Sequence, residues 1–184
     1  MLARHETLPL FPEEEPLLRG ASSLVVLDTV PAEEQYRDAV PVHDLAAAAG
    51  GFSGGQEPRP IGWARVHSRR LLDRRMFVAR VKGHSMEPGI PDGSWMLLRV
   101  YPAGEAPAAT ALDGRRVVVE LRGDGDPETG GAYTLKRWRV TKTGPDGGAT
   151  EIELRPDNPS FTSRRTKPAD GDIRVIAEFL EVVG

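Results

Sequence analysis

The sequence MFVARVKGHSMEPGIPDGSWMLLRV, residues 76–100, has the composition of two strands joined by a turn. Its first part (76–81) and its last part (95–100) are runs rich in β-branched and aromatic side chains, which favour strands. The Gly and Pro residues between them favour tight turns, and Gly83 allows the backbone to turn sharply. The stretch therefore predicts a strand, a turn that carries Ser85 just beyond the strand end, and a second strand.

Further strand signals follow along the chain. Runs of β-branched or aromatic residues, separated by turn segments rich in Gly, Pro and Asp, recur at 116–121, 133–138, 151–154 and 173–183. In the last run Ile176, Phe179 and Val182 do not share a parity, so the pattern predicts a β-bulge or a bend inside it. The predicted fold class is mainly β, a twisted and partly closed sheet.

The first 60 residues have a different composition. Residues 1–40 begin rich in Pro and Glu and carry a single strand signal at Leu24–Leu27, so we expect a weakly ordered N-terminal arm. Residues 41–60 are rich in small side chains, and glycines stop their alanine run at once, so we expect a mobile, accessible loop. The domain proper is then expected to be residues 61–184.

Composition argues against several classes of function. The chain has 184 residues and a net charge of −3, which does not suit a protein that coats nucleic acid. It has no cysteine, hence no disulfide and no thiolate ligand or nucleophile, and its four histidines are scattered. No apolar run approaches the ~20 residues of a membrane span, and the N-terminus lacks the features of a secretory signal. We expect a cytoplasmic protein without metal or cofactor.

Ser85 is the residue around which the candidate chemistry gathers. Its place after a strand, flanked by Gly83 and by Pro88-Gly89, presents the hydroxyl beside backbone N–H groups that can stabilise an oxyanion. A serine is a poor nucleophile without a base to take its proton. The sequence offers few His–acid pairs, so a lysine base is considered. His84 is interpreted as a loop residue, because neighbours on an extended segment point apart.

Lys136 is the candidate base. Alternation along 133–138 places it on one face with Thr134 and Trp138, and Arg137 on the other. Burial disfavours the charged form of a lysine, so an inward-facing amine would give up its proton more readily, with Thr134 orienting it. Spacing alone favours the alternative, a solvated lysine on an exposed strand face.

Three segments together resemble the LexA-type autopeptidases, which belong to the signal peptidase clan. The similar segments are Gly83-x-Ser85-Met86-x-Pro88-x-Ile90-x-Asp92-Gly93 for the nucleophile, Thr134-x-Lys136-Arg137 for the base, and 154–161 for the turn that follows. They occur in the family's order, and the resemblance covers roughly residues 42–183. It implies a LexA C-terminal-domain-like sheet and a catalytic Ser85–Lys136 dyad. Met86 and Gly83 would support the oxyanion and the turn.

The resemblance also implies a substrate within the chain. Members of this family cut an Ala-Gly bond upstream of the serine, and Ala49-Gly50 is such a bond, 35 residues before Ser85. Gly50-Gly51 is a less favoured cut, and a flexible linker is the alternative interpretation of the segment. Cleavage would act as a regulatory switch of the SOS type after DNA damage or stress, promoted by a RecA-type nucleoprotein filament. The resemblance further implies a homodimer formed through the C-terminal strands.

The sequence departs from the family in two places. Ser85 and Lys136 are 51 residues apart, with extra length at 101–112 and 123–131 that we expect to form surface loops. Residues 1–40 are too short and Pro-rich for a helix-turn-helix domain, so direct DNA binding is not expected, and the chain is more similar to the stand-alone UmuD type. Two other functions stay open: cleavage of other proteins in trans, and a catalytically idle dimerisation or interaction module.

Overall fold

The computed structural model describes residues 24–45, 58–102, 104–123 and 125–184. The strands of this part of the chain are β1 (Val26–Leu27), β2 (Ala39–Val42), β3 (Gly62–Arg65), β4 (Met76–Arg80), β5 (Trp95–Val100), β6 (Arg116–Leu121), β7 (Tyr133–Thr143), β8 (Ala149–Arg155), β9 (Arg164–Thr166) and β10 (Ile173–Val183). Two 3-10 turns accompany them, η1 (Ala109–Leu112) and η2 (Pro168–Asp170). The predicted mainly β class is confirmed. No helix in the described ranges is long and apolar enough to cross a membrane.

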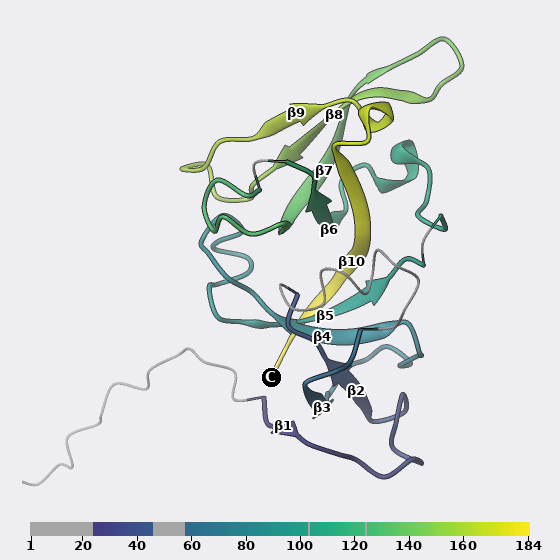
Figure 1. Ribbon diagram of the computed structural model, residues 1–184, viewed down its shortest axis with the longest axis vertical. Helices are drawn as coiled ribbons and strands as arrows, with labels where there is room; N and C mark the ends of the chain where they lie inside the picture. Colours follow the sequence, from purple (N-terminus) through teal and green to yellow (C-terminus); the bar gives the residue numbers. More distant parts are fainter. Residues whose placement is uncertain (1–23, 46–57, 103, 124) are drawn as a thin grey trace, which may run out of the picture.

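The strands form one open mixed sheet in the order β1-β3-β2-β4-β5-β10-β6-β7-β8-β9. β2 runs parallel to β4, whereas the flanking pairs β2·β3 and β4·β5 are antiparallel. Figure 1 shows β6 to β9 at one end of the molecule and β1 to β5 at the other, with β10 running between them. The sheet thus consists of two parts joined by its last strand.

β10 can join the two parts because it is long and irregular. Its N-terminal part pairs with β6, and its C-terminal part pairs with β5. The pairing register shifts between Val175 and Ala177 on the β6 side, and between Phe179 and Glu181 on the β5 side. These shifts confirm the bulge predicted from the broken alternation, because an extra residue changes which face the following side chains occupy.

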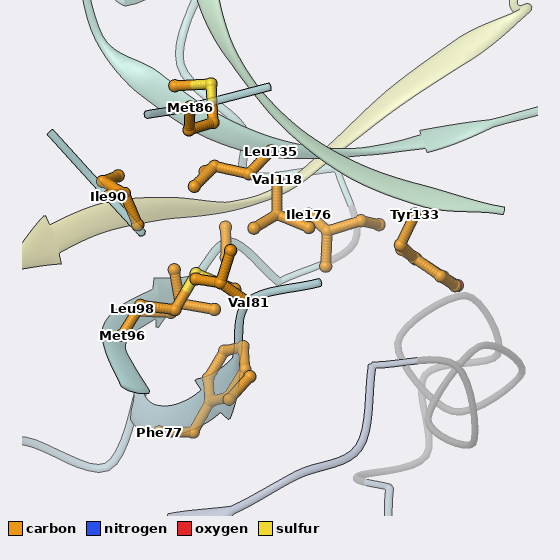
Figure 2. Packing of buried hydrophobic residues seen from close by; sticks show 12 residues of the cluster. Phe77, Val81, Met86, Ile90, Met96, Leu98, Val118, Tyr133, Leu135 and Ile176 are labelled. Atoms are coloured by element: carbon orange, nitrogen blue, oxygen red, sulfur yellow. The ribbon is translucent and has the colours of Figure 1, made fainter. Parts of the chain in front are cut away.

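One hydrophobic core is shared by strands on both sides of β10. Figure 2 shows its members packed together; they come from β4, β5, β6, β7, β10 and the turn after β4, and include Phe77, Val81, Met86, Ile90, Met96, Leu98, Val118, Tyr133, Leu135 and Ile176. Because a single cluster contacts strands from both parts, the sheet has to curve around it. The alternation of the predicted strands supplies these inward-facing side chains.

The strand signal at Leu24–Leu27 corresponds to β1, but a second strand before residue 61 was not predicted. Residues 39–42 form β2, all four are buried, and they lie between β3 and β4. The sheet therefore includes residues before 61. β2 spans the expected boundary between the N-terminal arm (1–40) and the loop (41–60). Pro41 concealed this strand, because proline lacks the N–H that a strand inside a sheet donates. The arm before residue 24 lies outside the described residues.

The core assignment can be tested with two leucines. Leu98 on β5 has no exposed surface, and Leu98→Ala is expected to lower the free energy of unfolding by about 2–5 kcal/mol, because it leaves a cavity. Leu71 is 93% exposed, and Leu71→Ala is expected to change the same free energy by less than about 0.5 kcal/mol. Urea unfolding followed by circular dichroism compares them. Equal effects of the two substitutions would contradict the assignment.

Candidate active site

Ser85 lies in the connection between β4 and β5 and is 6% exposed. Gly83 has a φ of +95°, a left-handed conformation that favours glycine. Its N–H donates to Asp92 Oδ1 at 2.8 Å, and the Ile90 N–H donates to the Met86 carbonyl at 3.0 Å. These bonds close the turn around Ser85 and limit where its hydroxyl can lie.

Lys136 lies on β7 and is 9% exposed. Its Nζ is 2.9 Å from Ser85 Oγ and 2.7 Å from Thr134 Oγ1. Alternation places Lys136 and Thr134 on the same face of β7, while Arg137 points to the other face and donates to Asp157. A buried amine in contact with a serine hydroxyl is an arrangement in which a neutral lysine can accept the serine proton.

Backbone donors next to Ser85 are available to a ligand. Among the described residues, the N–H groups of Ser85 and Met86 have no hydrogen-bond partner, whereas those of Gly83, His84 and Glu87 do. Such donors can stabilise negative charge that develops beside the hydroxyl. The Met86 side chain is 2% exposed and packs in the core (Figure 2), which anchors this turn.

A carboxylate that the sequence did not reveal lies beside Lys136. Asp126 is 3% exposed, and its Oδ2 is 3.4 Å from Lys136 Nζ. Its Oδ1 accepts hydrogen bonds from the N–H groups of Glu128 and Thr129, each at 3.0 Å. Burial acts to raise the pKa of Asp126. The hydrogen bond from Thr134, the charge of Lys136 and the two N–H groups outweigh burial, so the pKa of this carboxyl lies below its usual value.

Asp126 adds a buried group to the 123–131 segment. Most described residues of this segment are exposed or partly exposed, as expected of a surface loop, but it also buries one carboxylate against Lys136. The sequence Asp-Pro-Glu-Thr at 126–129 signals a turn capped by its aspartate. This local signal accounts for the hydrogen bonds to Asp126 Oδ1. It does not indicate that Oδ2 contacts Lys136 on β7.

The turn after β8 holds the Ser85 segment in place. The Asn158 N–H donates to the Ser85 carbonyl, and the Asn158 side-chain Nδ2 donates to the His84 carbonyl, both at 3.0 Å. The neighbouring Asp157 accepts hydrogen bonds from Arg116 on β6 and Arg137 on β7, at 2.7 to 3.0 Å. The turn thus ties the Ser85 segment to the strand that carries the lysine.

His84, next to the serine, faces solvent. Its side chain is 59% exposed, and its Nδ1 lies 2.9 Å from Glu87 Oε1. The hydrogen bond to Glu87 and the negative charge of that carboxylate raise the pKa of His84. The Ser85 hydroxyl is hydrogen-bonded to Lys136 instead. The geometry therefore favours the lysine over the histidine as the group that would take the serine proton.

A cleft of ≈ 490 Å³ opens at Ser85. Its lining comes from residues 43–45 after β2, from the end of β4 and the turn that follows, from the start of β5, and from the 126–135 segment. The expected cleavage bond, Ala49-Gly50, lies outside the described residues. Leu45 and Ile61, which lie on either side of that stretch of chain, both line the cleft.

Comparison with known families bears directly on this arrangement. The sequence profile of the family described as Peptidase S24-like matches residues 42–180, most of the chain. The chain therefore belongs to the Peptidase S24-like family, the LexA- and UmuD-like serine peptidases, as the three resembling segments implied. No curated protein matches the chain.

Because of the Asp157 carboxylate, the stability of the fold depends on pH in the acid range. Burial acts to raise its pKa, but the hydrogen bonds from Arg137 and Arg116 outweigh burial and hold the pKa below its usual value. The unfolded chain then binds the proton more readily than the folded chain does. The contribution to stability is therefore complete above about pH 4 and is lost as the pH falls through the lower, folded-state pKa.

Asp157→Asn is expected to lower the free energy of unfolding at neutral pH by about 1–3 kcal/mol, because two guanidinium groups lose a charged acceptor. The substitution should also reduce the fall in stability on acidification, because one titrating carboxyl is removed. Urea unfolding of both proteins at a series of pH values measures the two effects. Parallel pH profiles for wild type and variant would contradict this role.

Proposed function

We propose that this protein is a self-cleaving serine peptidase in which Ser85 is the nucleophile and Lys136 the general base. The observation that carries the proposal is the 2.9 Å contact between Lys136 Nζ and Ser85 Oγ, both buried, in a member of the S24-like peptidase family. Thr134 supports it, because its Oγ1 lies 2.7 Å from the same amine and orients it.

The chemistry follows from these contacts. Neutral Lys136 takes the proton of the Ser85 hydroxyl while Oγ attacks the carbonyl carbon of the scissile bond. The N–H groups of Ser85 and Met86 stabilise the negative charge on the carbonyl oxygen. The C–N bond breaks as Lys136 returns the proton to the leaving amine, which leaves an ester on Ser85. Water, deprotonated by Lys136, hydrolyses that ester and restores the serine.

The proposed substrate is the Ala49-Gly50 bond of the same chain. Leu45 and Ile61, which lie before and after this bond in the sequence, both line the cleft at Ser85. From Leu45 to Ala49 is four residues, which extend at most roughly 14 Å. Small side chains before the bond allow an extended segment to approach the serine closely.

Incubation of the purified protein at alkaline pH, which increases the neutral share of a lysine, is expected to yield fragments 1–49 and 50–184. Ser85→Ala and Lys136→Ala should each lower the rate by roughly 10³-fold or more, because nucleophile and base act as a unit. Mass spectrometry identifies the bond. Wild-type protein that stays intact would overturn self-cleavage under these conditions and favour the idle interaction module.

Mixing separates cleavage in cis from cleavage in trans. Wild type is incubated with a tagged Ser85→Ala chain, which is expected to stay intact because a tethered substrate outcompetes one in solution. Cleavage of the tagged chain would favour a peptidase that acts on other proteins. A further arm adds a RecA-type nucleoprotein filament at neutral pH. Acceleration there is expected for the DNA-damage switch, which we propose from family membership.

Cleavage at Ala49-Gly50 would cut the chain between β2 and β3. The N-terminal product would carry β2, whose residues lie buried between β3 and β4. Val40 and Val42 have no exposed surface, and burial of each contributes roughly 1.5–3 kcal/mol. The product is therefore held in the sheet by strand pairing and packing after the bond is broken.

The two fragments are accordingly expected to co-elute in size-exclusion chromatography at neutral pH and to separate in urea. The double variant Val40→Ala, Val42→Ala should release the N-terminal fragment more readily, because both side chains pack in the cluster around β2. Elution of fragment 1–49 as a separate peak from freshly cleaved wild type would show that β2 does not retain the product.

A further inference from the structure

Asp126 is a buried charged group that the chemistry above does not use. Its Oδ2 lies 3.4 Å from Lys136 Nζ, and its side chain is 3% exposed. The Thr134 hydroxyl, which accepts a hydrogen bond from Lys136 at 2.7 Å, is also bonded to Asp126. The carboxylate therefore contacts the proposed base directly and through the residue that orients it.

We propose that Asp126 is a positioning residue that holds Lys136 as an ammonium in the resting protein and so sets the pH at which self-cleavage begins. The inference rests on the proposed function of the Ser85–Lys136 pair. Removal of the serine proton requires the neutral amine, whereas a carboxylate this close stabilises the charged amine. Burial acts in the other direction, because it disfavours the ammonium. Asp126 therefore acts as a brake on the base.

Other charged or titratable groups line the cleft at Ser85 or lie on β6, the strand paired with β7, and among the described residues none of them forms an ion pair with Lys136. They are His43 and Asp44 after β2, Arg80 on β4, Lys82 after it, Glu128 in the 125–132 segment, Tyr133 on β7, and Arg116 and Glu120 on β6. In the β6·β7 pairing, Lys136 lies opposite Val117, not opposite an acid. Within the described part of the chain, Asp126 is the carboxylate paired with this amine.

The two carboxylate oxygens of Asp126 have different partners. Oδ1 accepts from the backbone N–H groups of the turn, and Oδ2 faces Lys136. Two residues further along, Glu128 accepts a hydrogen bond from the His84 N–H. Its carboxyl group lies 2.6 Å from the position that a Cβ on Gly83 would take. One loop therefore contacts the proposed base with Asp126 and the Ser85 segment with Glu128. A change in this loop reaches both members of the pair.

Asp126→Asn tests the proposal, because asparagine keeps an oxygen for the N–H groups of the turn and loses the charge. The rate of self-cleavage of the full chain is measured from neutral to strongly alkaline pH. The pH of half-maximal rate is expected to fall by about 1–3 units, and the rate at neutral pH to rise about tenfold or more. If the pH of half-maximal rate is unchanged or more alkaline, the proposal is overturned, even where the maximal rate changes.

Two control variants and one substitute test variant accompany it. Asp126→Glu keeps the charge and should retain the wild-type pH profile. Asp146→Asn makes the same chemical change in the exposed turn between β7 and β8 and should also retain it. Where Asp126→Asn does not fold, as judged by circular dichroism, Asp126→Ser supplies an uncharged acceptor for the turn. It is expected to lower the midpoint in the same way.

A second readout does not require cleavage. The sequence has four lysines, Lys82, Lys136, Lys142 and Lys167, so ¹³C-labelled lysine gives a simple NMR spectrum in which Lys136 is assigned by its loss in Lys136→Arg. In an uncleavable Ser85→Ala background, Asp126→Asn is expected to make the Lys136 signal titrate at lower pH. An unshifted titration would overturn the role of Asp126 even where wild type cleaves. A shifted titration in a protein that never cleaves would preserve this role and overturn the proposed peptidase activity.

Discussion

β10 pairs with β5 along one part of its length and with β6 along the other, and its bulges let one strand serve both. β4 and β7, which lead to Ser85 and carry Lys136, are four positions apart in the sheet, about 19 Å if the sheet were flat. The two side chains nevertheless meet at 2.9 Å. A sheet that curls around a shared core brings them together, and β10 contributes Ile176 and Ala177 to the centre of that core.

The same packing that stabilises the fold also positions the site. Met86, the residue after the serine, is buried in the shared core with Leu135, the neighbour of Lys136 (Figure 2). Asn158 adds a hydrogen bond from the turn after β8 to the Ser85 carbonyl. The amine enclosed by these contacts has two hydroxyl partners and a carboxylate, which is how proteins accommodate a buried polar or charged group.

Much of the fold could be predicted because its signals are local. The run 116–121 is a strand with the predicted bounds, and the run 133–138 is the start of β7. The bulge in β10 followed from parity alone. β2 could not be recognised, because it contains Pro41 and has only four residues. Its place in the sheet comes from its burial against β3 and β4, which a short local pattern does not encode.

The site divides in the same way. By itself the sequence determined the strand pattern, the turn around Ser85 and, through the ordered resemblance of three segments, the family. Spacing alone favoured a solvated Lys136, and nothing local pointed to Asp126 as its neighbour or to Asn158 as the partner of the Ser85 segment. Only the tertiary structure decided that this lysine is buried and that these residues converge, because the contacts join residues 10 to 74 positions apart. They form only when the sheet curls around its core, and no local propensity specifies that curvature.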